Sequence, residues 1–140
     1  MIQSIRLTHF SSHIALGLVL WASMGNAQTL SDVDAGWRIM VNRQQGNCLT
    51  CHQITVLRDA KGIDGAAGKQ GEFGPALDGV ANRYSVAQLR QWVMDARKMH
   101  PNTLMPPFGT LEGTSQANPA RPILSAEDIN KVTAALATLR

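Results

Sequence analysis

Hydrophobic residues recur at helical spacing in three stretches of the chain. The pattern predicts helices over residues 32–43, 85–99 and 125–139, each with one apolar face. In chain order these faces comprise Val33, Trp37, Met40 and Val41; Val86, Leu89, Trp92, Val93 and Ala96; and Ile129, Val132, Leu136 and Leu139. No stretch shows the sustained alternation of apolar and polar residues that marks a half-buried strand. The predicted fold class is therefore all-α.

Local signals mark where the predicted helices begin. Ser31 or Asp32 is the expected N-cap of the first helix and Ser85 that of the second. Ser125 begins the third helix in capping-box spacing with the aspartate three residues later, which replaces the usual glutamate. Gly36 lies inside the first helix, where glycine costs about 1 kcal/mol relative to alanine. This glycine is either simply tolerated or allows another helix to approach closely.

Glycine and proline mark two long connections between the helices. Residues 53–75 contain glycines at positions 62, 65, 68, 71 and 74, which predict a flexible surface loop. Residues 106–124 contain prolines at positions 106, 107, 119 and 122 and form the second predicted loop.

The first 27 residues have the pattern of a secretory signal peptide. Arg6 precedes an almost wholly apolar run from Ile14 to Met24, and Gly25 and Ala27 are small residues at the −3 and −1 positions of a cut after Ala27. This apolar run is too short to cross a membrane as a helix, which needs about 20 residues. We expect a cleaved signal peptide over 1–27, a single domain over 28–140 and a periplasmic location.

Composition excludes several classes of protein. A chain of 140 residues with 44% hydrophobic and 16% charged residues is typical of one globular domain and unlike a disordered polyelectrolyte. The net charge is +3, and the basic residues are scattered, so no nucleic-acid-binding stripe is present. Two cysteines are too few for a multi-disulfide scaffold.

Both cysteines fall in one motif, Cys48-Leu49-Thr50-Cys51-His52. C-x-x-C-H is the attachment signature of c-type haem. Two thiols at this spacing reach the two vinyl groups of one porphyrin and form thioethers, while the adjacent histidine becomes the proximal ligand of the iron. The motif therefore predicts one covalently attached haem c on Cys48 and Cys51, with His52 as an iron ligand.

Three other interpretations of the motif compete with haem attachment. A thioredoxin-like redox pair needs a βαβ context, which the helical pattern lacks. A zinc site needs about four ligands, and beyond this motif the expected mature chain offers only His100 as a further histidine. A short-range disulfide between Cys48 and Cys51 agrees with export but leaves His52 unexplained.

An iron bound by one histidine needs a sixth ligand or keeps an open site. Met105 lies in the loop sequence Leu-Met-Pro-Pro-Phe, whose prolines hold the backbone extended and prevent a helix. It is the favoured candidate, the alternative being a methionine that fills a gap beside a turn. His100, at the end of the second predicted helix, is the rival ligand, although there it also complements the helix dipole. The helical methionines Met40, Met94 and Met99 are more typical of core filling.

Gly74-Pro75 follows His52 by 22 residues. The carbonyl of Pro75 is a candidate acceptor for the Nδ1–H of His52, a bond that fixes the ring of an iron-binding histidine and raises its basicity. The alternative is that Gly-Pro marks an ordinary turn.

The order of these features resembles class I cytochrome c, and more narrowly the SoxX family, the small monohaem subunits of SoxAX complexes in bacterial sulfur oxidation. The resemblance extends from about Gly36 to Arg140. The stretches that carry it are Asn42-Arg43, Gly46-Asn47-Cys48 with Cys51-His52, Gly74-Pro75-Ala76-Leu77-Asp78-Gly79-Val80-Ala81 with Arg83-Tyr84, Met105-Pro106 and Arg121-Pro122-Ile123-Leu124. The segment 108–120 is shorter than in that family, so a docking surface formed there would differ.

The resemblance implies a fold, a site and a set of partners. The fold is that of class I cytochrome c, with about three main helices around one haem. By position, Cys48 and Cys51 hold the haem, His52 and Met105 bind iron, and Pro75 orients His52. The implied partners are a larger SoxA-type cytochrome with the reactive cysteine, the SoxYZ carrier to which thiosulfate is joined oxidatively, and a soluble cytochrome c that accepts the electrons. This chain has no free thiol for that reaction once haem is attached.

Two other functions remain open at this stage. A free-standing periplasmic electron carrier uses the same ligands, and a haem sensor leaves the sixth position open. Arg83 and Arg121 are candidates for contact with an anionic substrate, although solvated surface charge is the simpler interpretation. Neither a nucleic-acid partner nor a membrane span is expected.

Overall fold

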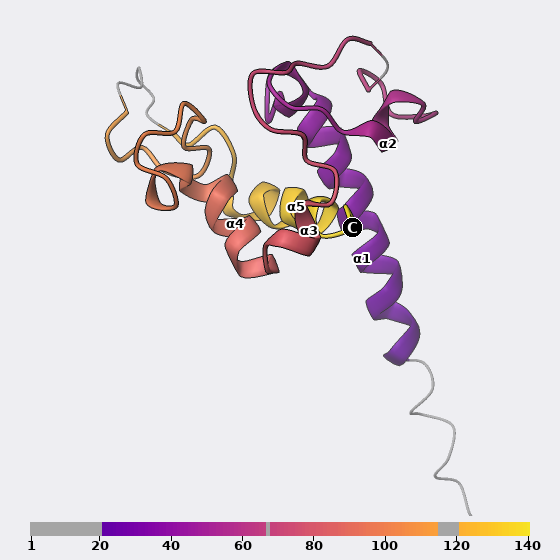
Figure 1. Ribbon diagram of the computed structural model, residues 1–140. Helices are drawn as coiled ribbons and strands as arrows, with labels where there is room; N and C mark the ends of the chain where they lie inside the picture. The colour runs from indigo at the N-terminus through magenta and orange to yellow at the C-terminus, as the bar shows by residue number, and fades with distance from the viewer. Residues whose placement is uncertain (1–20, 67, 115–120) are drawn as a thin grey trace, which may run out of the picture.

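A computed structural model describes residues 21–66, 68–114 and 121–140, with side chains from residue 31 onward. Within these ranges every regular element is helical and no strand occurs, as the hydrophobic pattern predicts. The elements are α1 (Trp21–Val41), η1 (Cys48–Thr50), α2 (Thr55–Arg58), α3 (Val80–Arg83), α4 (Val86–Asp95), η2 (Ala96–Lys98) and α5 (Ala126–Leu136), where η denotes a 3₁₀ helix (Figure 1).

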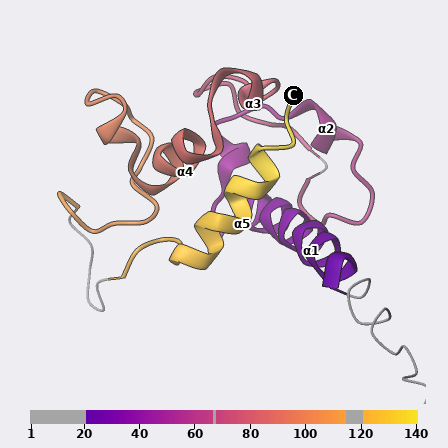
Figure 2. The same ribbon diagram turned by 90° about the horizontal axis from the view of Figure 1, so that it is seen from below.

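The crossing of α1 and α5 is the centre of the fold (Figure 2). Gly36 lies at this crossing: a Cβ atom there would collide with the backbone carbonyl of Lys131 and come within 2.9 Å of the Cβ of Ala135. Of the two interpretations of this glycine, close helix approach is therefore confirmed. Removing the side chain lets the two backbones meet, which offsets the cost of glycine inside a helix.

Ser85 and Ser125 cap α4 and α5, as the sequence predicts, and both form capping boxes, of which only the one at Ser125 was expected. The Ser85 hydroxyl oxygen accepts a hydrogen bond from the backbone N–H of Gln88, and the Gln88 side chain accepts one from the backbone N–H of Ser85. Ser125 and Asp128 make the same reciprocal pair at the start of α5. Each box satisfies two backbone N–H groups that a helix start leaves without a partner.

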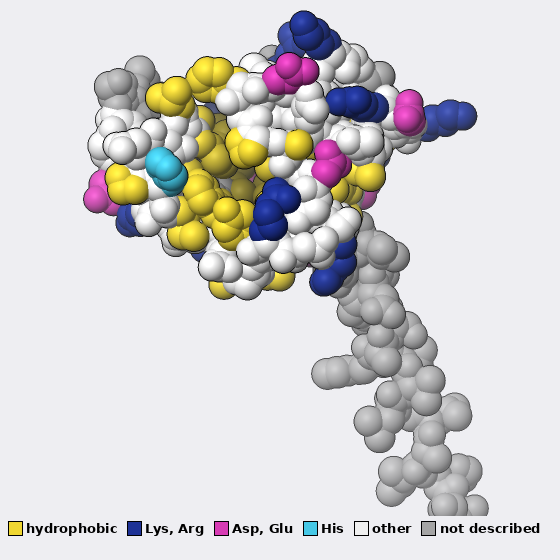
Figure 3. All heavy atoms as spheres, in the orientation of Figure 1, with side chains coloured by type: hydrophobic (Ala, Val, Ile, Leu, Met, Phe, Trp, Pro, Cys, Tyr) yellow, Lys and Arg dark blue, Asp and Glu magenta, His cyan; other side chains and the backbone are white. Residues whose placement is uncertain are grey.

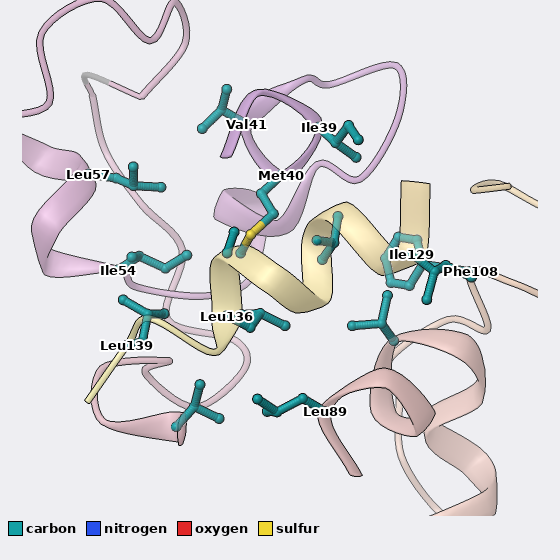
Figure 4. Close-up of a cluster of buried hydrophobic side chains, with 14 of the residues drawn as sticks. Ile39, Met40, Val41, Ile54, Leu57, Leu89, Phe108, Ile129, Leu136 and Leu139 are labelled. Atoms are coloured by element: carbon teal, nitrogen blue, oxygen red, sulfur yellow. The ribbon is translucent and has the colours of Figure 1, made fainter. Parts of the chain in front are cut away.

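The hydrophobic core lies between these helices and the segments that follow α1 (Figure 4). Met40 points from α1 toward α5 and is fully buried, as are Ile54 and Ile129. The predicted faces of the second and third helices are buried as expected, except at Val86 and at Trp92, which is half-buried. Val86 is 60% exposed, because it is the first residue of α4 and precedes the turns that pack on α5.

Some predicted boundaries are wrong. The first helix begins at Trp21, so neither Ser31 nor Asp32 is its N-cap. A helix that has been nucleated extends through neighbouring residues at little further cost, and no proline interrupts this stretch. α4 ends at Asp95 and continues as a 3₁₀ turn to Lys98, and α5 ends at Leu136 rather than Leu139.

The segment predicted as a flexible surface loop, residues 53–75, is partly inside the molecule. It contains α2, and Ile54, Leu57, Ala66 and Gln70 are all buried. Its glycines mislead the prediction, because a glycine-rich segment can equally well pass close to other backbone.

The expected signal peptide falls largely outside the described residues, which begin at Trp21. Within the part of the chain that is described, none of the helices combines the length and the hydrophobicity that a membrane crossing requires.

Candidate haem site

The Cys-Leu-Thr-Cys-His motif forms one tight turn. Asn47 before it has a left-handed backbone (φ 49°), which asparagine tolerates better than most residues, and its side chain accepts a bond from Thr50 Oγ1 at 2.6 Å. The backbone N–H groups of Cys51 and His52 both donate to the Cys48 carbonyl, at 3.1 and 3.0 Å. This turn brings both thiols and the imidazole onto one short piece of backbone.

Residues 70–78 run alongside this turn and bind it through hydrogen bonds between distant parts of the chain. Gln70 holds Ile54 at both polar backbone atoms: its Oε1 accepts from the N–H at 2.7 Å and its Nε2 donates to the carbonyl at 3.0 Å. Asp78 accepts from the backbone and hydroxyl of Thr55, each at 3.0 Å. Three backbone bonds complete the contact, from Gly71 N to Leu49 O, Gly74 N to Cys51 O and Leu77 N to Gln53 O.

The hydrogen bond expected between His52 and Pro75 is present, with 2.7 Å between Nδ1 and the carbonyl oxygen. A carbonyl only accepts, so Nδ1 must carry the proton and Nε2 is left with a free lone pair, the form in which histidine binds metal. Gly74 packs directly on this ring, since a Cβ there would lie 2.7 Å from Nδ1 and 3.0 Å from Nε2. The Gly-Pro pair therefore sets both the orientation and the tautomer of His52.

A hollow lined with hydrophobic side chains opens on the face shown in Figure 3. In this orientation it lies between the segment after α1, the segment after η2, and α4. Cys48, Tyr84 and Met105 are half-buried residues that pack against the core. Among the described residues, Nε1 of Trp92 is the one buried side-chain nitrogen or oxygen without a hydrogen-bond partner. The ring of Trp92 packs edge to face on that of Tyr84, with 5.9 Å between the ring centroids. An apolar hollow, two thiols, an oriented imidazole and an unpartnered N–H fit a haem.

The structure separates the candidates for the sixth ligand by location. Met105 is half-buried against the core, and its N–H donates to Thr103 Oγ1 at 3.2 Å. His100 is exposed at the end of the turn after η2. Met40 is fully buried between helices, and Met94 packs at the backbone of Gly109, so both serve as core residues.

Competing interpretations of the two cysteines find little support. No disulfide joins Cys48 to Cys51. Desolvation raises the pKa of the Cys48 thiol to about 12, which removes the thiolate that a redox or nucleophilic cysteine needs. In the described ranges no three His, Cys, Asp or Glu residues form a cluster suited to a metal ion.

Of the two arginines considered for substrate contact, Arg83 has a structural role. Its guanidinium donates to the carbonyls of Asp78 and Ala76, at 3.1 and 3.4 Å, and so supports the turn that contains Pro75. Arg121 is exposed, in keeping with solvated surface charge.

Sequence reasoning missed several residues that shape this site. Gln70 and Asp78 form hydrogen bonds to backbone groups, which every residue has, so no sequence motif indicates their role. The apolar spacing predicts for Trp92 only a place on a buried helix face, although its indole nitrogen distinguishes it from the purely apolar members of that face. The ion pair of Asp95 with Arg97, 2.8 Å apart, was also missed.

An all-helical fold that contains both a C-x-x-C-H turn and an apolar hollow is that of a class I cytochrome c. The family model described as cytochrome c matches residues 33–140. The chain therefore belongs to the cytochrome c family and carries covalently bound haem c through Cys48 and Cys51.

A solved structure narrows the comparison. A chain of the crystal structure of SoxXA from P. pantotrophus matches with a TM-score of 0.65 and 36% sequence identity, over 76% of this chain and 80% of that one. This likeness agrees with the SoxX resemblance. No curated protein matched the sequence.

Proposed function

We propose that this protein is the electron-accepting subunit of a SoxAX-type complex in the periplasm. The complex joins thiosulfate oxidatively to a cysteine of a SoxYZ carrier, and this chain passes the electrons to a soluble cytochrome c. The observation that carries the proposal is the 36% identity to a chain of the SoxXA structure over most of both chains. The partner is a larger SoxA-type cytochrome c.

The iron ligands in this proposal are His52 and Met105. His52 presents a free Nε2 because Nδ1 is bound to Pro75, and Met105 lies half-buried in a proline-held loop. The exposed position of His100 supports Met105 over it. The bound haem supplies reversible one-electron transfer, and a His/Met ligand pair raises its potential, as an electron acceptor requires.

The sulfur chemistry belongs to the partner subunit. Joining thiosulfate to a cysteine thiolate forms one S–S bond and releases two electrons. Both cysteines of this chain are committed to haem, so it has no thiol to bind sulfur. Its contribution is to take up the electrons one at a time.

Export to the periplasm is part of the proposal. It is supported by the apolar run Ile14–Met24 and the small residues before the expected cut after Ala27. An oxidising compartment does not threaten the two cysteines with disulfide formation, because their thiols are consumed when the thioether bonds to haem form.

Purification of the tagged protein from its native periplasm tests the proposal. The tag belongs at the C-terminus, since the N-terminus is expected to be cleaved, and a mock purification from untagged cells is the control. We expect a second, larger c-type cytochrome in stoichiometric amount, revealed by haem staining. Thiosulfate together with the carrier should then reduce the haem of this chain only when that partner is present. A lone haem protein that thiosulfate and carrier leave oxidised under the same mild conditions would instead indicate a free-standing electron carrier.

A further inference from the structure

The end of α4 is broken by a buried carboxylate. Asp95 is 2% exposed and has an extended backbone (φ −157°, ψ 93°), which ends the α-helix and begins the 3₁₀ turn η2. Its Oδ1 accepts from the backbone N–H and from Nε of Arg97, at 3.2 and 2.8 Å. Its Oδ2 accepts from Nη2 of the same arginine at 3.0 Å. The guanidinium is thus fixed in one orientation by a two-oxygen contact.

The opposite side of that guanidinium reaches a distant part of the backbone. Nη2 of Arg97 donates to the carbonyl of Glu112 at 2.5 Å, and Nη1 lies 3.5 Å from the carbonyl of Gly113. One side chain therefore links the end of α4 to residues 112–113. The planar fork of arginine can serve a carboxylate and backbone carbonyls together, which the single ammonium of lysine cannot do.

The segment joined in this way contains Met105. At its start, the N–H of His100 bonds to the carbonyl of Ala96, and further along the N–H of Gly109 bonds to the carbonyl of Met94. Arg97 closes the far end. Among the described residues, Met105 makes one hydrogen bond, from its N–H to Thr103 Oγ1. Apart from the packing of its side chain against the core, the position of its thioether therefore depends on the contacts that hold the two ends of this segment.

We propose that Asp95 and Arg97 are positioning residues that hold the loop carrying Met105 against the haem. This inference rests on the proposed function, in which Met105 is the sixth ligand. The pair acts through the loop and touches neither haem nor substrate. Loss of the pair is expected to leave the fold and the haem attachment intact and to loosen the sulfur–iron bond.

Displacement of the methionine by added imidazole tests the proposal on the ferric holoprotein. Imidazole binds only when Met105 has left the iron, so its apparent affinity includes the equilibrium for opening the loop. Arg97→Gln removes charge-assisted hydrogen bonds to two carbonyls, and we expect it to raise the imidazole affinity about tenfold or more. Arg90→Gln is the matched control. It changes an arginine of α4, whose Nε donates to Asn130 Oδ1 of α5 at 3.0 Å. Arg97, by contrast, lies in η2 and bonds to residues 112–113.

A second variant and a second measurement guard against a general loss of stability. Arg97→Lys keeps the charge, and we expect it to restore only part of the wild-type behaviour. Proton NMR of the reduced protein reports the bound methionine directly, because the ring current of the haem shifts its side-chain signals far upfield.

Each outcome decides between the two claims. The positioning role is overturned if R97Q binds imidazole with an affinity within about twofold of both wild type and R90Q while the methionine signals are present. That result leaves the assignment of Met105 as the ligand standing. Wild-type protein without those signals overturns the assignment of Met105, and the positioning role with it. An equal rise of imidazole affinity in R97Q and R90Q shows general loosening and also overturns the proposal.

Discussion

Replacing Gly74 with alanine tests how tightly the chain surrounds the imidazole of His52. The added Cβ would come closest to Cε1 of the ring and would lie 2.7 Å from Nδ1. Ordinary van der Waals contact begins near 3.4 Å, so the ring or the backbone must retreat by more than about 0.7 Å. The ring cannot yield freely, because its Nδ1 is held 2.7 Å from the carbonyl of Pro75. The backbone cannot yield freely either, because the N–H of Gly74 bonds to the carbonyl of Cys51 at 2.8 Å.

The expected cost follows from these two contacts. Overpacking of this kind destabilises a protein by about 1–3 kcal/mol. Loss of the His52–Pro75 hydrogen bond adds about 1 kcal/mol. We therefore expect the free energy of unfolding of Gly74→Ala to fall by about 2–4 kcal/mol, with a changed haem potential because the imidazole is no longer oriented by its acceptor.

Urea unfolding of the holoprotein, followed by circular dichroism and haem absorbance, measures this loss. Ala76→Ser is the matched control, since Ala76 lies on the same turn and its side chain is exposed. We expect the control to stay within about 0.5 kcal/mol of wild type. A Gly74→Ala protein with wild-type stability and wild-type potential would refute the argument that this glycine holds the ring.

Three further predictions concern the ligand loop, a helix start and the acid limit of stability. Met105→Ala should leave the iron with an open position, so that the ferrous protein binds carbon monoxide readily and loses its upfield methionine NMR signals; retention of those signals would show that another group is the ligand. Ser125→Ala removes the capping box of α5 and should lower the free energy of unfolding by about 1 kcal/mol in a urea titration, whereas a loss below about 0.3 kcal/mol would contradict the capping role. The hydrogen bond from Arg97 lowers the pKa of Asp95 below its ordinary 3.8. The ionised Asp95 therefore contributes its full stabilisation above pH 3.8, and this stabilisation is lost as the pH falls through the lowered pKa. The difference in unfolding free energy between wild type and Asp95→Asn should therefore shrink below about pH 4; a constant difference down to pH 2 would contradict the pairing.

Features carried by a few neighbouring residues are predictable from this sequence. The C-x-x-C-H motif needs only five consecutive residues, and the capping boxes of Ser85 and Ser125 need only four. The apolar faces of α4 and α5 follow from a spacing that any helix imposes. In each case the interaction closes within one or two turns of the chain, so the sequence order is enough to show it.

Predictions failed where a distant part of the chain decided the outcome. The glycines of residues 53–75 indicate a surface loop, yet Ile54 and Gln70 are buried and bonded to each other. Val86 continues a helical pattern but lies outside the packed turns. α1 includes Ser31 and Asp32 in its interior, which shows that a good N-cap residue need not begin a helix when the residues before it can also be helical.

The sequence by itself determined the all-α class, the two haem-binding cysteines and the adjacent histidine. Only the tertiary structure decided how the site is supported. It packed Gly36 against the backbone carbonyl of Lys131, and it set the tautomer of His52 through the carbonyl of Pro75. It also placed Arg97, which is paired with Asp95, against the carbonyl of Glu112 beyond Met105. Most of these contacts end on a backbone carbonyl. Every residue has that group, so its use depends on where the folded chain brings it and leaves little trace in the sequence.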